Sequence, residues 1–435
     1  MRGRHLRPLV TVGLAALLLL GVGAVLGARS PAPAGPQPVT EVASATGQLD
    51  AAIERAQQRL RRVPGDYLTW AALGSAYLER ARITADPSYY ELADGALRRS
   101  LAERPDGNPD ALVGLGALAN ALHDFAEARA LAQEALELNP YDADAYGVLA
   151  DAETQLGNPD AATEAVQRML DLRPSLPAYA RASYDLEQRG RIDEARSLME
   201  YALAAAFDPA DIAFCHYQLG ELAWHAGDLA EAEAQYRAGV AAAPNYLPLR
   251  QGLAKVAAAR GDLPAAIAGY AELTAAAPTP DYLMQYAELL RAAGREAEAG
   301  EQLALAEAAH ELFLAAGGAD HLTGAELAIA RDRPEEALRL AELEWEQRQF
   351  TGVADTLGWA LHLNDRDEEA LAYAGRANAL GAQNATYAYH LGMIRFRLGD
   401  REAARAELAR ALDINPYFSP WYAPRAARTL QALES

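Results

Sequence analysis

The chain has 435 residues, a formal net charge of −21 and a single cysteine, Cys215. A surface with this excess of acidic residues repels nucleic acid and anionic lipid, so we expect no nucleic-acid partner. A single cysteine also excludes a disulfide within the chain and a metal site built from several thiolates.

Residues 1–28 are predicted to form a signal peptide or an N-terminal transmembrane anchor. Arg2, Arg4 and Arg7 give this segment a basic start, and residues 9–28 carry no charge. As a helix, an uncharged run of this length spans about 30 Å, enough to cross the hydrocarbon core of a membrane. The basic flank predicts a cytoplasmic N-terminus and export of the rest of the chain. We expect a single-pass cell-membrane protein with its repeats outside the cytoplasm or, if the segment is cleaved, a periplasmic or secreted protein.

Two short segments precede the main body of the chain. Residues 29–47 are rich in proline and are predicted to be an extended linker. Residues 48–66 have small and apolar residues at the spacing of a single amphipathic helix. We predict that they form an N-terminal half repeat, which starts a stack of helices.

A sequence period of 34 residues dominates the chain and is clearest between residues 109 and 174. Two units align there without a gap: Pro140 and Pro174 close them, and Ala128 and Ala162 fill the same place in each. Apolar residues recur at the spacing of a one-sided helix, and each proline ends a helix because it lacks an N–H group. One helical hairpin of this kind cannot bury its apolar stripe alone, so several hairpins must stack in line.

About ten such units are predicted between residues 67 and 416, followed by a capping helix at residues 417–435. In the first unit, residues 81–90 place the second helix about seven residues late. These residues form either a longer loop or a protrusion in which Tyr89 and Tyr90 contact a partner. The seventh unit lacks its closing proline, so we predict a long second helix there.

The period and the residues at its fixed positions resemble those of the tetratricopeptide repeat family. The first unit carries the series Trp70, Leu73, Gly74 and Tyr77 at the spacing that the family shows. This resemblance implies an all-α fold, a right-handed α-solenoid of stacked helix-turn-helix repeats. It also implies a scaffold that binds a protein or peptide partner.

No motif in the sequence supports an enzymatic activity. There is no phosphate-binding loop G-x-x-x-x-G-K-[ST], no nucleophile elbow G-x-S-x-G and no zinc-binding H-E-x-x-H. No stretch outside the repeats is long enough for a catalytic domain. We therefore expect a protein that is not an enzyme, with no cofactor and no metal.

Members of the family bind partners on the inner, concave face of the solenoid, which is lined by the first helices of the repeats. Carried over by position, the resemblance assigns partner binding to Tyr184, Glu187, Phe214, Tyr217, Glu221, Trp224, Gln251, Lys255, Trp359, Tyr389 and Phe396. Aromatic residues exposed in a groove would give a partner a large contact area at low entropic cost. The alternative is that these aromatic residues pack against neighbouring helices as part of the core.

The charge of the groove narrows the choice of partner. Lys255 is the only lysine in the sequence, so the basic residues with which some members of the family bind acidic tails are absent. An acidic groove instead favours a basic or largely apolar segment. Two functions stay open: an exported, membrane-tethered adaptor that holds a partner in its groove, or a structural subunit of an extracytoplasmic or cell-surface assembly that self-associates through its repeat ends.

Overall fold

The computed structural model describes residues 45–434, and every regular element in this range is an α-helix. The first helix is α1 (Ala45–Arg62) and the last is α22 (Ala423–Glu434). The helices between them pack in ten consecutive pairs: α2 (Tyr67–Thr84) with α3 (Ser88–Glu103), α4 (Pro109–Ala121) with α5 (Phe125–Leu138), α6 (Ala143–Leu156) with α7 (Pro159–Leu172), α8 (Leu176–Gln188) with α9 (Ile192–Ala205), α10 (Pro209–His225) with α11 (Leu229–Ala242), α12 (Leu247–Ala259) with α13 (Leu263–Ala276), α14 (Pro280–Ala292) with α15 (Glu296–Ala315), α16 (His321–Ala330) with α17 (Pro334–Gln347), α18 (Thr351–Leu363) with α19 (Asp367–Ala377), and α20 (Ala385–Arg397) with α21 (Arg401–Ile414). The predicted all-α solenoid of stacked helix pairs is confirmed.

One position in the second helix holds a buried alanine in every pair, and this small side chain allows the two helices to pack closely. Each of these alanines is at most 2% exposed; they are Ala93, Ala128, Ala162, Ala195, Ala232, Ala266, Ala299, Ala337, Ala370 and Ala404. Because protein interiors are close-packed, a larger side chain at any of these positions would push the two backbones apart. The recurring small residue of the sequence period therefore marks the place where the helices meet.

Local sequence also sets where the helices begin and end. Asp124 caps α5 by accepting a hydrogen bond from the backbone N–H of Glu127 at 3.1 Å. Such a cap satisfies one of the N–H groups that have no partner within the helix. Gly157 ends α6 in the left-handed conformation, with a φ of 82°, which glycine adopts without steric strain.

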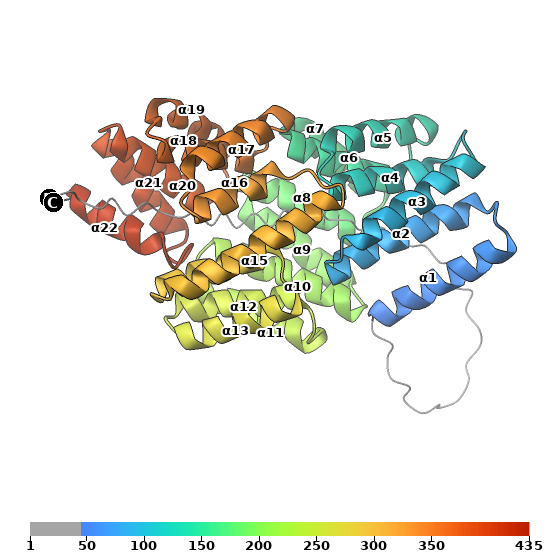
Figure 1. Ribbon diagram of the computed structural model, residues 1–435, viewed down its shortest axis with the longest axis horizontal. Coiled ribbons are helices and arrows are strands. Elements are labelled where there is room, and N and C mark those ends of the chain that lie inside the picture. Colours follow the sequence, from blue (N-terminus) through green and yellow to red (C-terminus); the bar gives the residue numbers. More distant parts are fainter. Residues whose placement is uncertain (1–44, 435) are drawn as a thin grey trace.

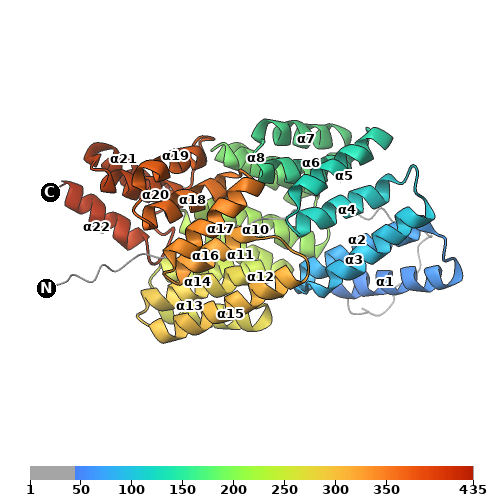
Figure 2. The same cartoon turned by 45° about the horizontal axis from the view of Figure 1, so that its top comes forward.

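The ten pairs wind into a tight superhelix in which one turn contacts the next. The backbone N–H of Ala319, before α16, donates to the carbonyl oxygen of Leu122, after α4, at 2.9 Å. Asn415, before α22, donates from its side chain to the carbonyl oxygen of Trp224, near the end of α10, at 2.8 Å. These contacts join residues about 190 to 200 positions apart, which corresponds to six helix pairs. In Figures 1 and 2 the later helices α16–α21 accordingly lie against α6–α10.

Residues 81–90 form neither the loop nor the protrusion that the sequence analysis considered, so both interpretations are wrong. Helix α2 continues to Thr84, and α3 begins at Ser88 after a short turn. Tyr89 and Tyr90 belong to α3 and are partly buried, and the ring of Tyr89 lies 6.2 Å from that of Tyr77. The extra residues extend α2 to 18 residues, and those at its end, residues 82–84, are exposed. The long second helix predicted in the seventh unit is found as α15, which has 20 residues.

The N-terminal predictions fall largely outside the described residues. The predicted anchor at residues 1–28 and most of the predicted linker at 29–47 lie there. Helix α1 begins at residue 45, three residues before the predicted start of the half repeat. Within residues 45–434, none of the helices combines the length and the hydrophobicity needed to span a membrane.

Candidate binding cavity

A cavity of about 610 Å³ lies on the inner face of α10, α12 and α14. Residues 416–427, which lead from α21 into α22, form its opposite side, and we call them the C-terminal wall segment. In both overall views, α22 lies at one end of the molecule (Figures 1 and 2). The cavity is thus closed by a segment far from α10–α14 in the sequence, and the inner face is covered there.

Five of the predicted partner-binding residues line this cavity. They are Tyr217, Glu221, Trp224, Gln251 and Lys255. Five further polar side chains of α10–α14 line the cavity but were not predicted; they are His225, Tyr270, Asp281, Gln285 and Glu288. The predicted residues were chosen at fixed positions in the first helix of each repeat. Asp281 and Glu288 occupy two of these positions in the next repeat, so applying the same rule there would have found them. The C-terminal wall segment gives no such signal, because it is outside the repeats.

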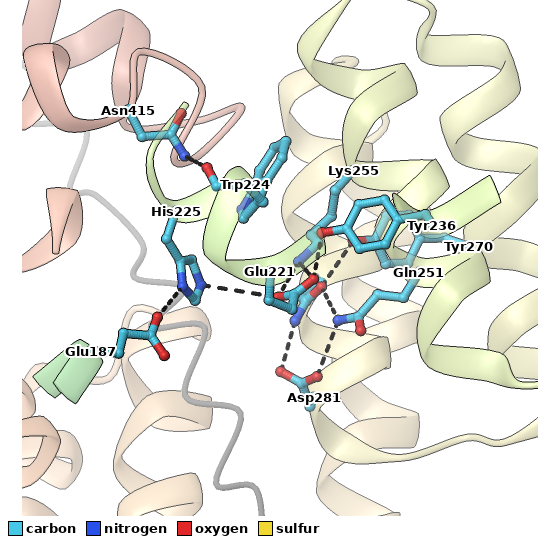
Figure 3. Close-up of polar contacts among 11 residues, drawn as sticks. Glu187, Glu221, Trp224, His225, Tyr236, Gln251, Lys255, Tyr270, Asp281 and Asn415 are labelled. Atoms are coloured by element: carbon cyan, nitrogen blue, oxygen red, sulfur yellow. Dashed lines mark hydrogen bonds and ion pairs between the residues drawn. The ribbon is translucent and has the colours of Figure 1, made fainter. Parts of the chain in front are cut away.

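Glu221 is the centre of a buried ion pair at the base of the cavity. The Nζ atom of Lys255 lies 2.7 Å from each of its carboxylate oxygens, and the hydroxyl of Tyr236 donates to Oε1 at 2.6 Å (Figure 3). Lys255 also lies over the ring of Trp224, with Nζ 5.2 Å from the ring centroid. Burial alone would raise the pKa of Glu221, but the positive charges of Lys255 and His225 outweigh it and hold the pKa below its usual value. Glu221 is therefore an ionised carboxylate with its own cation.

His225 connects this ion pair to α8. Its Nδ1 atom lies 2.7 Å from Oε1 of Glu187, and its Nε2 atom lies 4.0 Å from Oε2 of Glu221 (Figure 3). Burial lowers the pKa of His225, but the hydrogen bond to Glu187 and the charges of Glu187 and Glu221 together raise it above the usual value. The imidazole thus favours its charged form between two carboxylates.

Helix α14 carries a stripe of polar side chains on the other side of the cavity. Gln285 donates to Oδ1 of Asp281 at 2.8 Å, and its own oxygen accepts hydrogen bonds from Gln251 at 2.8 Å and from the Tyr270 hydroxyl at 2.9 Å. Burial raises the pKa of Asp281 to about 6. Burial likewise raises the pKa of Glu288, to about 7. Neither carboxyl group forms an ion pair among the described residues, and the charges of Lys255 near Asp281 and of Arg291 and Arg425 near Glu288 do not outweigh the effect of burial.

Polar contacts with the inner face hold the C-terminal wall segment in place. The hydroxyl of Ser419 donates to Oε1 of Glu288 at 2.5 Å. Asn415, just before the segment, donates to the carbonyl oxygen of Trp224 at 2.8 Å (Figure 3). The same two residues, Trp224 and Glu288, therefore line the cavity and hold its cover.

The aromatic side chains of the cavity are packed rather than exposed. Trp224 is only 8% exposed, and Tyr217 is also buried; both belong to one hydrophobic cluster with Tyr236, Leu249 and Val256. Of the two alternatives for these rings, packing in the core therefore holds. The expectation of aromatic residues standing free in an open groove is wrong for this pair, although their edges line the cavity.

The predicted cluster on α18 and α20 is wrong as an exposed binding surface. Trp359 and Tyr389 are 0% and 1% exposed. The C-terminal wall segment covers them, with the ring of its Tyr422 5.3 Å from that of Tyr389 and 6.4 Å from that of Trp359. Only Phe396, which is 37% exposed, keeps a surface position.

The remaining predicted residues lie on α8 and at the start of α10, away from the main cavity. Tyr184 lines a separate space of about 240 Å³ between neighbouring superhelical turns. Glu187 does not line the main cavity but contacts it through His225. Phe214 packs at the edge of the cluster around Met199. Within residues 45–434, no group of three or more acidic, histidine or cysteine residues has the arrangement of a metal site.

Comparison with known proteins identifies the repeats. Sequence profiles described as tetratricopeptide repeats match residues 119–183, 180–246 and 385–418. None of the curated proteins matches the chain. The profiles therefore cover helices from both halves of the solenoid, including the helices that carry Glu221 and Trp224.

Several solved structures share the helix-pair architecture. A thermophilic TPR protein of Thermus thermophilus is 24% identical, with 41% of this chain and 95% of that chain covered and a TM-score of 0.35. PilW, a widely conserved type IV pilus biogenesis factor, is 23% identical, with 46% and 92% covered and a TM-score of 0.39. The APC/C hetero-tetramer Cut9-Hcn1 is 14% identical, with 90% and 94% covered and a TM-score of 0.40. These scores are low, and nothing about the partner of this chain follows from them. The three matched segments thus contain tetratricopeptide repeats, and they lie within a continuous run of helix pairs.

Proposed function

We propose that this protein is a non-enzymatic scaffold that binds a segment of a partner protein in the cavity between α10–α14 and the C-terminal wall segment. Tetratricopeptide repeats mediate protein–protein interactions, and the inner face supplies the site. The observation that carries the proposal is the cavity of about 610 Å³, with packed aromatic walls and fixed polar groups. A concave apolar site with a few oriented polar side chains is the usual form of a binding pocket.

The size and the chemistry of the cavity favour an extended segment over a folded domain. Its volume accommodates a few side chains. The amide groups of Gln251 and Gln285 lie at its surface and offer donors and acceptors to a peptide backbone. With three carboxyl groups, one lysine and one histidine in its lining, the cavity is acidic. It therefore suits a basic or largely apolar segment.

A photo-crosslinking experiment tests the binding site. Ala259, at the end of α12, lines the cavity, and Tyr201 on α9 is 65% exposed elsewhere on the molecule. A photoreactive amino acid at position 259, in the native cell, should crosslink a partner protein that the same amino acid at position 201 does not. Equal crosslinking at both positions would contradict a specific site. Crosslinks between two copies of the chain would instead support the alternative, a self-associating structural subunit.

We further propose that the scaffold is exported and tethered to the membrane by residues 1–28. The basic residues Arg2, Arg4 and Arg7 and the uncharged run at 9–28 support this proposal. A reporter fused after Ser435 that is active only outside the cytoplasm should then be active. Changing the three arginines to glutamate should abolish or scramble this activity. Cytoplasmic activity of the unmodified fusion would contradict export.

A further inference from the structure

We propose that the cavity accepts a cationic side chain, lysine or arginine, of the partner segment, and that Asp281 and Glu288 on α14 are its counter-ions. This inference rests on the proposed function and names the chemistry of the partner. It follows from a comparison between carboxylates that line the same cavity, one of which already has a cation while the other two do not.

Glu221 and Lys255 show how this cavity holds a cation. The ammonium group of Lys255 lies 2.7 Å from both oxygens of Glu221 and 5.2 Å from the centroid of the Trp224 ring. A carboxylate and an aromatic face thus bind the same charge, an arrangement that stabilises a partly desolvated cation. As a result the buried carboxylate of Glu221 stays ionised.

Asp281 and Glu288 face the same cavity but have no ion-pair partner among the described residues. Asp281 accepts hydrogen bonds from the amide groups of Gln285 and Gln251, at 2.8 Å and 3.5 Å. Glu288, which is 7% exposed, accepts one from the Ser419 hydroxyl and one from the backbone N–H of Trp421. These neutral donors satisfy oxygen atoms but supply no positive charge.

The two arginines nearest to Glu288 are engaged elsewhere. Arg291 pairs with Glu296 at 3.2 Å and donates to the carbonyl oxygen of Ala330 at 2.8 Å. Arg425 stacks on the ring of Trp421, 3.5 Å from its centroid, and donates to the carbonyl oxygen of the same residue. Neither arginine forms an ion pair with Glu288, so the position beside this carboxylate is left for an external cation.

The two carboxyl groups are placed to act together on one bound segment. Asp281 and Glu288 are seven residues apart on α14, so they lie on the same face about two helical turns, or about 10 Å, from each other. The space in front of them is part of the cavity of about 610 Å³. Burial raises the pKa of Asp281 to about 6 and that of Glu288 to about 7. A cation bound between them would favour ionisation of both groups and release protons.

Peptide titration tests the proposal. The full-length protein is titrated by calorimetry with the capped pentapeptide of sequence Ala-Ala-Lys-Ala-Ala and with the same peptide carrying norleucine in place of lysine. We expect the lysine peptide to bind at least tenfold more tightly at pH 8. This preference should decrease between pH 8 and pH 5.5, because protonation of Glu288 and Asp281 removes the negative charge.

Variants separate the site from the general acidity of the surface. Glu288→Gln keeps an acceptor for Ser419 but removes the charge, and it should reduce the preference for lysine about tenfold. Asp281→Asn provides a second test should the first variant disturb the C-terminal wall segment. Glu298→Gln is the matched control, because Glu298 is an exposed carboxylate paired with Arg295 on α15, and it should leave the preference unchanged.

The results of these titrations decide whether the cavity binds a cationic side chain. Equal affinity for the two peptides, no binding of either peptide, or an equal loss in Glu298→Gln would overturn the inference. The proposed function is judged separately, by the crosslinks from position 259. If a partner is crosslinked at position 259 but the two peptides bind with equal affinity, the proposed binding site stands and the proposed cationic side chain is ruled out.

Discussion

At the scale of single residues, Trp224 is a core residue that also lines the cavity. Its ring packs in a cluster with Tyr217 and Val256, and one face of the ring holds the ammonium group of Lys255. Its carbonyl oxygen accepts the hydrogen bond from Asn415. A binding defect in a Trp224 variant therefore has to be separated from unfolding.

Trp224→Ala should lower the free energy of unfolding by about 3–5 kcal/mol, because a buried aromatic ring is lost and leaves a cavity. Urea denaturation followed by circular dichroism measures this loss. Tyr201→Ala is the control: Tyr201 is 65% exposed, and its replacement should change stability by about 0.5 kcal/mol or less. A loss below about 1 kcal/mol for Trp224→Ala would show that the ring is not part of the core.

At the scale of elements, the end of α21 differs from the end of α5 because it also contacts another superhelical turn. The sequence Asn-Pro-Tyr ends both α5 and α21, at Asn139 and at Asn415. In both places the asparagine oxygen accepts a hydrogen bond from the backbone N–H of the tyrosine two residues later, at 3.2 Å and 2.8 Å. Only Asn415 also donates to another superhelical turn, at Trp224. One local motif thus ends a helix in both places and fixes the C-terminal wall segment in one.

This pair of asparagines allows the contact between turns to be measured. Asn139→Ala and Asn415→Ala both remove the local turn contact, but only the second removes the bond to Trp224. We expect Asn415→Ala to cost about 1 kcal/mol more than Asn139→Ala, the usual net value of one hydrogen bond. The difference between the two unfolding free energies is the test, and equal losses would mean that the bond from Asn415 to Trp224 contributes nothing.

At the scale of the whole molecule, contact between superhelical turns places the C-terminal wall segment opposite the inner face, and the space between them is a partly open cavity. The turns that follow the first helices carry the contacts. Gly190, after α8, has a φ of 71°, and a Cβ atom there would lie 2.3 Å from the carbonyl oxygen of Gly381. Gly261, after α12, has a similar φ of 82°, but a Cβ atom there would meet nothing within 4 Å. The first glycine lies between two superhelical turns and the second does not.

Alanine substitutions at these two glycines should therefore differ. Gly261→Ala should cost about 1–2 kcal/mol, because only the left-handed conformation is penalised. Gly190→Ala should cost more and should force the two turns apart, since neither backbone can yield without a shift. Small-angle scattering should show an increased radius of gyration for Gly190→Ala and none for Gly261→Ala. An unchanged radius in both variants would contradict the close contact between turns.

The sequence by itself determined the helix pairs of this protein. Helical periodicity, capping residues and closing prolines act within a few residues, so they indicate where helices begin, end and meet. The series of buried alanines that begins with Ala93 is an example: each lies where the period places a small residue. The same reasoning selected Glu221, Trp224 and Lys255, which do line one cavity.

Only the tertiary structure decided how the inner face is closed. The small rotation from one pair to the next accumulates over six pairs, and no local pattern reports whether two turns then touch. Contacts such as that between Asn415 and Trp224 join residues 191 positions apart. For the same reason the sequence could not show that Tyr422 covers Trp359 and Tyr389, because burial at those positions depends on a segment outside the repeats. Local periodicity therefore determines where the helices form, whereas the rotation accumulated from pair to pair determines which helix faces stay exposed.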